Sequence, residues 1–477
     1  MTMNQPTADR ANPDKVLPVT KGYPLVGSLP GLLADPFGFF EQARSVHGDI
    51  YRLDLGFTKV VVLGHPRHAQ HVFVDQAARY TKGGAFWDTL RSIFGNGLLT
   101  SEGEFWLRQR RMMQPHFHRR RLADLTSSLV RAIEESLSAW PRQLASDPPF
   151  DLAPAFNELT MRLTMRALFG ENLSLKMAAD VAGALSYVVD YVLRAFVTKS
   201  LPRFIPIPGR KKYEQAIAII DESILPIIEA RRGRNEQGGH LLAMLIDAVD
   251  DKTDDRMTTQ QLRDEVTTLF VAGFETTAVA LSWTFECLAG RPDIQRRLHA
   301  EVDEVLGDRL PTFDDLPRLR YARMVLQEAM RLYPPAWQLP RLAVRDDVID
   351  GYPIPAGTTL VNLIYAYHRH PEEWSNPGVF DPERFNPERS ERRHNLAYMP
   401  FGAGQRLCLG RDLVLLEGPL AIAMVAQRFS VHAASRRPVA SMTSTLRPKG
   451  GVLVRLVERA RDPATSPACT LHTPRRD

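Results

Sequence analysis

The loop that carries Cys408 has the residue types of a reactive thiolate site. It runs Phe401-Gly-Ala-Gly-Gln-Arg-Leu-Cys-Leu-Gly410 and leads directly into the apolar helical pattern DLVLLEGPLAIAMVAQRF. A cysteine at a helix N-terminus lies near the positive end of the helix dipole and near backbone N–H groups, and both lower the pKa of its thiol. Gly404 and Gly410 permit a flat ligand to approach closely, and Arg406 adds a cation. We expect a ligand-binding thiolate; a buried structural cysteine near a turn is the alternative.

A second candidate site lies in the apolar segment VTTLFVAGFETTAVALSWTF. Its motif Ala272-Gly-Phe-Glu-Thr-Thr277 places glycine and threonine in a helical pattern that they disfavour, so local helix propensity is sacrificed. The segment is long enough to cross a bilayer, but a charge at its centre, Glu275, is costly there, which favours a buried helix. Glu275 and Thr276 form an acid-alcohol pair that can relay protons, although a helix can also bury such a pair for structure alone.

Several arginines have the spacing of an anion-binding surface. Trp106 and Arg110 are four residues apart in EFWLRQRRMM and share one helix face, and Arg341 lies in the segment LPRLA. Planar donors of this kind suit carboxylates, with a solvated basic face as the alternative. Six arginines, two histidines and no acid lie between Arg108 and Arg121. The residues between them form no stacking platform for bases, so we expect an acidic electron-transfer protein here and no nucleic acid.

Three histidines, His65, His68 and His71, recur at a spacing of three residues, which could indicate a metal site. No carboxylate or cysteine accompanies them in the sequence. We therefore expect surface histidines at the start of a helix, with their hydrogen bonds satisfied.

Together these motifs resemble the cytochrome P-450 superfamily. Its haem-ligand signature Phe-x-x-Gly-x-Arg-x-Cys-x-Gly is matched at all five fixed positions of the Cys408 loop. Glu328 and Arg331 in QEAMRLYPP, followed by FDPERF with Arg384, resemble the family's buried Glu-Arg-Arg cluster, which is structural. The Glu275 motif resembles the family's distal-helix motif. The resemblance covers residues 20 to 455.

The resemblance implies a chemistry for these residues. Cys408 would ligate the iron of haem b, within a loop that also places Phe401, Arg406 and Gly410 at the cofactor. Trp106, Arg110 and Arg341 would bind the haem propionates. In the helix, Gly273 and Thr276 would open a groove for O₂, while Glu275 supplies protons from solvent and Thr276 hydrogen-bonds the activated oxygen.

The resemblance also implies a hydrophobic substrate. The regions that form the family's pocket walls carry mostly apolar residues, among them Phe86, Trp87, Phe94, Phe196, Phe204, Ala272 and Leu339. About half of the rings are expected to be core only. The implied reaction is hydroxylation or epoxidation of a terpenoid, a polyketide-like scaffold or a fatty acid. A peroxide-driven hydroxylase and a non-catalytic haem-thiolate sensor are the rival interpretations, and the intact Glu275-Thr276 pair argues against both.

The elements that must position these residues follow from hydrophobic periodicity. We expect a helix at DPFGFFEQARSVHG, strands at DIYRLDL and TKVVVLG, and a largely helical block from 103 to 300. A further helix ends at Pro334-Pro335, VIDGYPIPAGTTLVNLIYAY reads as two strands, and residues 371 to 407 form a long irregular loop. The predicted fold is mainly α with a minor β part, a single triangular cytochrome P-450 domain at 20–455. Residues 1–19 are expected to be a flexible segment and 456–477 a disordered tail.

Composition limits the remaining possibilities. Apolar residues are 44% and charged residues 24% of 477, which is ordinary for a globular chain, and three cysteines exclude a disulfide framework. The N-terminus shows no signal peptide or membrane anchor. No dinucleotide fingerprint is present, so separate ferredoxin and ferredoxin reductase proteins are expected to supply NAD(P)H electrons. We expect a cytoplasmic monomer.

Overall fold

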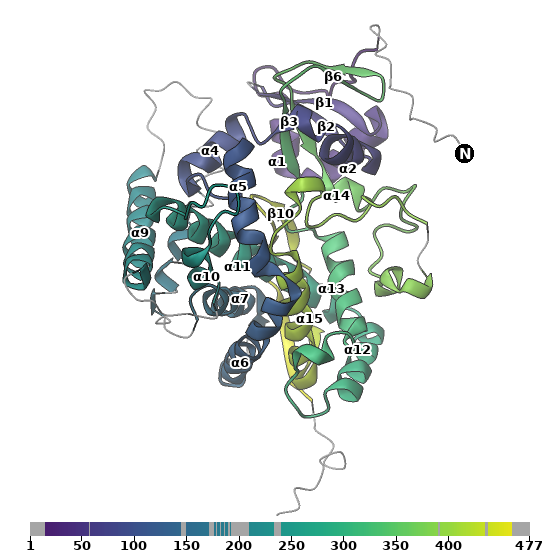
Figure 1. The fold of residues 1–477 in the computed structure, drawn as a ribbon. Helices are drawn as coiled ribbons and strands as arrows, with labels where there is room; N and C mark the ends of the chain where they lie inside the picture. The colour runs from purple at the N-terminus through teal and green to yellow at the C-terminus, as the bar shows by residue number, and fades with distance from the viewer. Residues whose placement is uncertain are drawn as a thin grey trace, which may run out of the picture.

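The structure is a computed structural model that describes residues 15–56, 58–144, 149–170, 176–177, 179–181, 183–185, 187–188, 191, 209–232, 240–389, 392–434 and 437–459. A β-rich part lies at the top of Figure 1, and the long helices fill the rest of the molecule below it. The prediction of a mainly α fold with a minor β part is confirmed.

The main sheet combines strands from two distant parts of the chain. It contains β1 (Ile50–Asp54), β2 (Lys59–Leu63), β3 (Tyr80–Thr81), β5 (Leu339–Ala343) and β8 (Thr359–Asn362), in the order β1-β2-β8-β5-β3. Only β2 and β8 pair in parallel. The two strands predicted near the start of the chain are confirmed as β1 and β2. Because β5 lies beside β8, the sheet fixes the segment that carries Arg341.

The segment from 348 to 367 differs from its prediction as two strands. It contains the end of β6 (Asp347–Ile349), then β7 (Tyr352–Ile354), β8 and a single helical turn, α14 (Ile364–Tyr367). The final residues leave the sheet because the Tyr367 hydroxyl donates to Asn362 at 3.1 Å and the backbone closes a turn on Leu363.

The helical part is built around one long central helix. The first helices are α1 (Leu29–Ala34), α2 (Pro36–His47), α3 (Pro66–Gln70), α4 (Ala85–Phe94) and α5 (Gly103–Met113). The next are α6 (Arg119–Leu144), α7 (Leu152–Phe169), α9 (Arg210–Arg232) and α10 (Leu241–Asp247). The last are α11 (Thr259–Ala289), α12 (Pro292–Val305), α13 (Arg320–Leu332) and α15 (Arg411–Arg428). The helices predicted at the start of the chain, from 103 to 300 and before Pro334 are confirmed.

Helix α11 begins at a capping box in which Thr258 and Gln261 satisfy each other's backbone N–H groups. It packs against α7, α9 and α13. Of the described helices it alone is long and apolar enough to cross a membrane, but 78% of its most apolar window is buried inside the protein. α11 is therefore a core helix, as its central acid predicted.

Both predicted domain boundaries fall within ordered structure. At the start, Val19 pairs with Arg52 and Lys15 donates to the carbonyl oxygen of Asp350, so residues 15–19 pack on the fold. At the end, the tail was predicted to start at 456, but β12 (Leu453–Glu458) continues to Glu458. It does so because residues 454–458 pair with β9 (Phe429–Ala433), and Leu456 is buried there. The rest of both terminal segments lies outside the described residues.

Two short antiparallel units near the C-terminus were not predicted. β12 joins β9 and β4 (Phe150–Asp151) in one sheet, while β10 (Val439–Met442) and β11 (Leu446–Lys449) form a hairpin. This hairpin contacts α11, which makes it part of the surroundings of the acid-alcohol pair.

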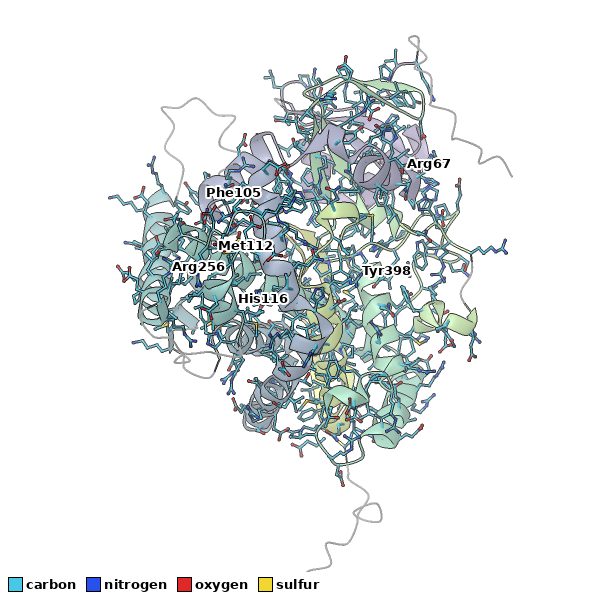
Figure 2. All side chains as sticks on the ribbon, in the orientation of Figure 1. Arg67, Phe105, Met112, His116, Arg256 and Tyr398 are labelled. Carbon is cyan, nitrogen blue, oxygen red and sulfur yellow. The ribbon has the colours of Figure 1, made fainter. Side chains whose placement is uncertain are left out.

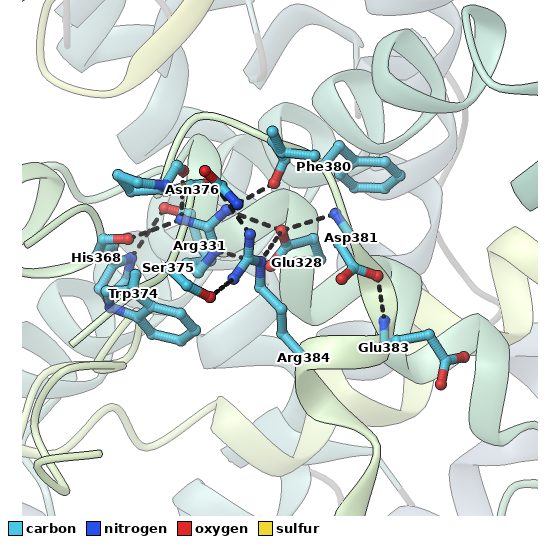
Figure 3. Close-up of polar contacts among 12 residues, drawn as sticks. Glu328, Arg331, His368, Trp374, Ser375, Asn376, Phe380, Asp381, Glu383 and Arg384 are labelled. Atoms are coloured by element: carbon cyan, nitrogen blue, oxygen red, sulfur yellow. Dashed lines mark hydrogen bonds and ion pairs between the residues drawn. The ribbon is translucent and has the colours of Figure 1, made fainter. Parts of the chain in front are cut away.

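The predicted Glu-Arg-Arg cluster is confirmed (Figure 3). Arg331 donates two hydrogen bonds to the carboxylate of Glu328 at 2.7 and 2.8 Å, and both side chains have no exposed surface. Arg384 lies 3.4 Å from the same carboxylate. The remaining Arg331 donors reach the carbonyl oxygens of His368, Pro377 and Val379, so the cluster ties α13 to the irregular loop.

We expect Arg331→Met to destabilise the fold by about 3–5 kcal/mol, because it leaves the carboxylate of Glu328 buried without its main partner. Arg323→Met, on an exposed position of the same helix, should change stability by no more than about 0.5 kcal/mol. Chemical denaturation of the two variants measures both values. Equal stability of the two variants would contradict the structural role of the cluster.

Candidate active site

The turn before α15 holds Cys408 in the interior of the protein. The backbone N–H of Cys408 donates to the carbonyl oxygen of Phe401 at 2.9 Å, which closes the loop. Gly404 has φ +63°, and a side chain there would collide with the backbone carbonyl of Phe73. Gly404 is therefore required by both conformation and space. Helix α15 begins at Arg411, three residues after Cys408.

The Cys408 side chain is exposed, yet the surrounding protein strongly desolvates its thiol. Burial raises the pKa of the thiol, while backbone N–H groups of Gly410 and Arg411 and the cations of Arg110 and Lys82 lower it. The predicted net lowering is therefore wrong for the thiol alone, because desolvation is the largest effect. A metal ion bound to the sulfur would deprotonate it regardless.

Two buried cations near Cys408 have no acidic partner. Lys82 donates to the carbonyl oxygen of Leu99 at 2.7 Å, and burial, followed by the charges of Arg341 and Arg406, holds the pKa of its ammonium well below the usual range. Arg341 is 5% exposed, and burial lowers its pKa to about 10. Neither forms an ion pair with any described residue. Buried unpaired cations are costly, so this region is built to receive anions.

Lys82 was missed by the sequence analysis. It stands alone as a charged residue in the stretch YTKGGAFW, which was the only available signal. Its ammonium lies 4.8 Å from the ring centroid of Trp87. The Trp87 ring and the carbonyl oxygen of Leu99 therefore both position it.

The other two residues predicted to bind propionates, Trp106 and Arg110, contact the Cys408 loop, which carries the predicted cofactor residue Arg406. The guanidinium of Arg406 stacks on Trp106 at 3.7 Å and pairs with Glu102 at 2.7 Å, so Arg406 holds the loop against α5. Arg110 donates to the carbonyl oxygen of Leu407 at 2.9 Å. The indole N–H of Trp106 donates to no described residue, which leaves it available to a ligand. Figure 2 shows the course of α5 and the short helix after it through Phe105, Met112 and His116.

One face of α11 is accessible in the middle of the protein. Leu269, Ala272, Gly273 and Thr276 are half-buried or exposed, whereas their neighbours on the helix are buried. Their spacing of three and four residues places them on one side of the helix. Space also favours glycine at position 273, because an added Cβ would lie only 3.2 Å from the hydroxyl of Thr164 on α7.

Glu275 and Thr276 have separate partners. The Thr276 hydroxyl donates to the carbonyl oxygen of Ala272 at 2.6 Å. Glu275 is buried and accepts hydrogen bonds from Thr445 at 2.6 Å and from Arg447 at 2.7 and 3.1 Å. The acid is therefore held by the β10–β11 hairpin, a partnership that the sequence analysis missed.

Five of the seven predicted pocket residues lie in the described part of the chain, and they divide into two groups. Ala272 is exposed on the accessible face of α11, while Leu339 and Phe86 are half-buried, and Leu339 lies close to Gly402 of the Cys408 loop. Trp87 and Phe94 are buried; the Trp87 indole donates to the carbonyl oxygen of Pro340 at 3.0 Å, and Phe94 belongs to the main core. Phe196 and Phe204 lie outside the described residues.

The histidines differ from their prediction. His65 and His68 are buried, and each histidine meets a carboxylate from a distant segment: His65 with Glu372, His68 with Asp350, and His71 with Asp347. The sequence analysis could not predict these carboxylate partners, because they lie about 280 to 310 residues along the chain from the histidines.

A three-group cluster that could hold a metal contains Asp49, His65 and His370. His65 Nδ1 accepts a backbone N–H from Arg67, so in the neutral ring Nε2 carries the proton and donates to Glu372. His370 is bonded in the same manner to Asp49. In the described structure these groups are therefore hydrogen-bonded as histidine-carboxylate pairs.

The arginine-rich segment is partly used inside the protein. Arg111 pairs with the buried carboxylate of Asp250 at 2.9 Å, and Arg108 lies 4.0 Å from it. Arg120 and Arg121 remain exposed at the start of α6. The surface available to a partner is therefore smaller than the sequence indicated.

Comparison with known proteins identifies the family. The cytochrome P450 family model matches residues 17–455. Cyclooctatin synthase of Streptomyces melanosporofaciens is 35% identical, over 86% of this chain and 89% of its own. Cyclooctat-9-en-7-ol 5-monooxygenase of the same organism is 33% identical over 88% and 89%, and pentalenene oxygenase of Streptomyces avermitilis is 31% identical over 88% and 93%. The crystal structure of the cytochrome P450DA haem domain superposes with a TM-score of 0.84 at 27% identity, covering 93% of this chain and 98% of that one.

The chain belongs to the cytochrome P450 family and has its single-domain fold. It is a haem monooxygenase, which uses O₂, a lipophilic substrate and redox partners. The residues present fit haem b: the Cys408 thiol offers the iron ligand, and Lys82 and Arg341, which pair with no acid among the described residues, offer charge to two propionates.

We expect Lys82→Met to accelerate haem loss about tenfold, since a charge-assisted hydrogen bond contributes about 1.5–3 kcal/mol. Transfer of haem to an excess of apomyoglobin measures the rate. Lys59→Met, an exposed lysine on β2, is the matched control and should leave the rate unchanged. The haem-free Lys82→Met protein should be at least as stable as the haem-free wild type, because the variant removes an unpaired buried charge. Haem loss at the wild-type rate would exclude Lys82 from propionate binding.

Proposed function

We propose that this protein hydroxylates or epoxidises a terpenoid, with Cys408 as the haem ligand and Glu275 and Thr276 as the catalytic proton-transfer pair. The observation that carries the proposal is the inward-facing thiol of Cys408 in a fold whose α11 presents an accessible, small-residue face. The substrate class is supported by three relatives at 31–35% identity, which are terpenoid-oxidising enzymes.

The residues of this chain divide the work of the reaction. Haem, when bound, supplies the iron that activates O₂ and delivers one oxygen atom to the substrate. Cys408 would ligate the iron and donate electron density to it, while Lys82, Arg341 and Trp106 would hold the propionate edge. The small side chain of Ala272, on the accessible face of α11, would leave room for a substrate.

Thr276 and Glu275 would handle protons. The Thr276 hydroxyl donates to the carbonyl oxygen of Ala272, so its oxygen can accept a further hydrogen bond from the reacting oxygen species or a water. Glu275 lies one residue earlier on the same helix and can exchange protons with water in the cavity.

The apolar lining supports a bulky hydrophobic substrate. Ala272, Leu339 and Phe86 offer no charge, and the described residues of the accessible α11 face include none. A fatty acid would need a cation for its carboxylate, and the two unpaired cations lie beside Cys408, where the propionates would occupy them. The geometry therefore favours a neutral terpenoid over a fatty acid or an acidic polyketide.

Electrons would come from a separate ferredoxin and its NAD(P)H-dependent reductase. The exposed Arg120 and Arg121, next to the α5 residues that contact the Cys408 loop, offer a basic surface to an acidic partner. We propose a monomer that works in the cytoplasm, where reduced cofactors are available.

Titration of the oxidised haem protein with cyclic terpene alkenes and alcohols, and with straight-chain fatty acids, tests the substrate class. We expect a low-spin to high-spin shift with terpenoids and dissociation constants at least about tenfold lower than for fatty acids, a difference of about 1.4 kcal/mol. Ala272→Leu should weaken terpenoid binding, because it fills the accessible face, while Ala433→Leu on the exposed strand β9 should not. Tighter binding of fatty acids would contradict the terpenoid assignment.

A further inference from the structure

The carboxylate of Glu275 is held through one oxygen only. Oε1 accepts hydrogen bonds from the hydroxyl of Thr445 at 2.6 Å and from Nη2 and Nε of Arg447 at 2.7 and 3.1 Å. Oε2 makes no hydrogen bond to any described residue, and it is absent from the fully buried polar atoms that lack a partner. One oxygen is anchored, and the other remains able to exchange a proton.

The hairpin that provides these donors is firmly attached. The indole N–H of Trp283, two turns further along α11, donates to the carbonyl oxygen of Leu446 at 2.6 Å. Trp337 donates to the carbonyl oxygen of Thr443 at 3.0 Å. The turn between β10 and β11 is thus fixed to α11 on one side and to the segment after Pro335 on the other. Thr445 and Arg447 therefore have little freedom to leave Glu275.

The charges explain why an arginine is needed. The Glu275 side chain is 7% exposed, and a buried carboxylate without a partner would favour its neutral form. Arg447 is 30% exposed, so it balances the carboxylate while keeping contact with solvent. Arg447 therefore gives this carboxylate a cationic hydrogen-bond donor at the edge of the protein interior.

We propose that Arg447 and Thr445 are positioning residues that prepare Glu275 for proton transfer, by fixing Oε1 and leaving Oε2 free to donate and regain a proton. This inference rests on the proposed function of Glu275. The contact spans about 170 residues of sequence and joins the C-terminal hairpin to the distal side of the active site.

The proton balance identifies the quantity to measure. Substrate, O₂, two electrons and two protons give hydroxylated product and water, whereas O₂, two electrons and two protons alone give hydrogen peroxide. Both outcomes consume the same electrons and protons. The peroxide formed per NAD(P)H consumed therefore reports whether protons arrive in the position that leads to product.

The experiment compares Arg447→Met, Arg447→Lys and Thr445→Val with the wild type, using the haem-loaded protein, a ferredoxin system and a terpenoid that turns over. We expect Arg447→Met to raise the peroxide fraction severalfold and to increase the solvent deuterium isotope effect on turnover. Arg447→Lys should restore at least half of the coupling, since an ammonium can still donate to Oε1. Thr445→Val should have a smaller effect. Substrate binding and the carbon-monoxide spectrum should not change in any of them.

The matched control is Lys449→Met, an exposed lysine two residues further along β11, which should leave coupling and the isotope effect at wild-type values. A double-mutant cycle of Glu275→Gln and Arg447→Met, measured by unfolding of the haem-free protein, tests the contact without turnover. We expect the two substitutions to be coupled by about tenfold or more in the unfolding equilibrium.

The possible outcomes distinguish a failure of the proposed function from a failure of the positioning role of Arg447. A wild type without turnover of any terpenoid would defeat the proposed function, and the cycle would then decide alone whether Arg447 holds Glu275. Wild-type coupling and isotope effect in Arg447→Met would overturn the positioning role, as would additive effects in the cycle.

Discussion

Cys408 is held by a turn that needs glycine, because Gly404 adopts φ +63° directly against the carbonyl oxygen of Phe73. The rest of the structure depends on this constraint. The Cys408 thiol lies just before α15, and three elements support its loop. Helix α5 contacts the loop through Arg406 and Arg110. The main sheet contacts it through Leu339, and the Glu328–Arg331 pair ties α13 to the irregular segment that leads into it.

Electrostatics around that turn are unbalanced in the protein alone. Lys82 and Arg341 are buried without acids, whereas Glu328, Glu275 and Asp250 each have a basic partner. Two buried cations near the Cys408 loop suit a ligand that carries two negative charges. Haem binding is therefore expected to stabilise the folded state well beyond the apolar contacts of the porphyrin, because it completes these two pairs.

The sequence predicted local geometry where residues lie close together along the chain. The turn of Cys408 before a helix and the Glu328–Arg331 pair at a helical spacing of three follow from local structure. The sequence was insufficient for partnerships between distant segments. The residues around Glu275 do not predict its contact with Arg447, and those around His65 do not predict its contact with Glu372. Lys82 could not be recognised as a site residue because its neighbouring cations, Arg341 and Arg406, come from distant segments. Short strands such as β10 and β11 were missed because four residues carry too little periodicity.

The carbon-monoxide difference spectrum of the reduced, haem-loaded protein tests the central claim most directly. With Cys408 as the iron ligand, the wild type should show the strongly red-shifted Soret band of thiolate ligation, and Cys408→Ser should lose that band while it remains folded and retains haem. A folded, haem-replete wild type without the band, or a Cys408→Ser protein that keeps it, would contradict the account of this site.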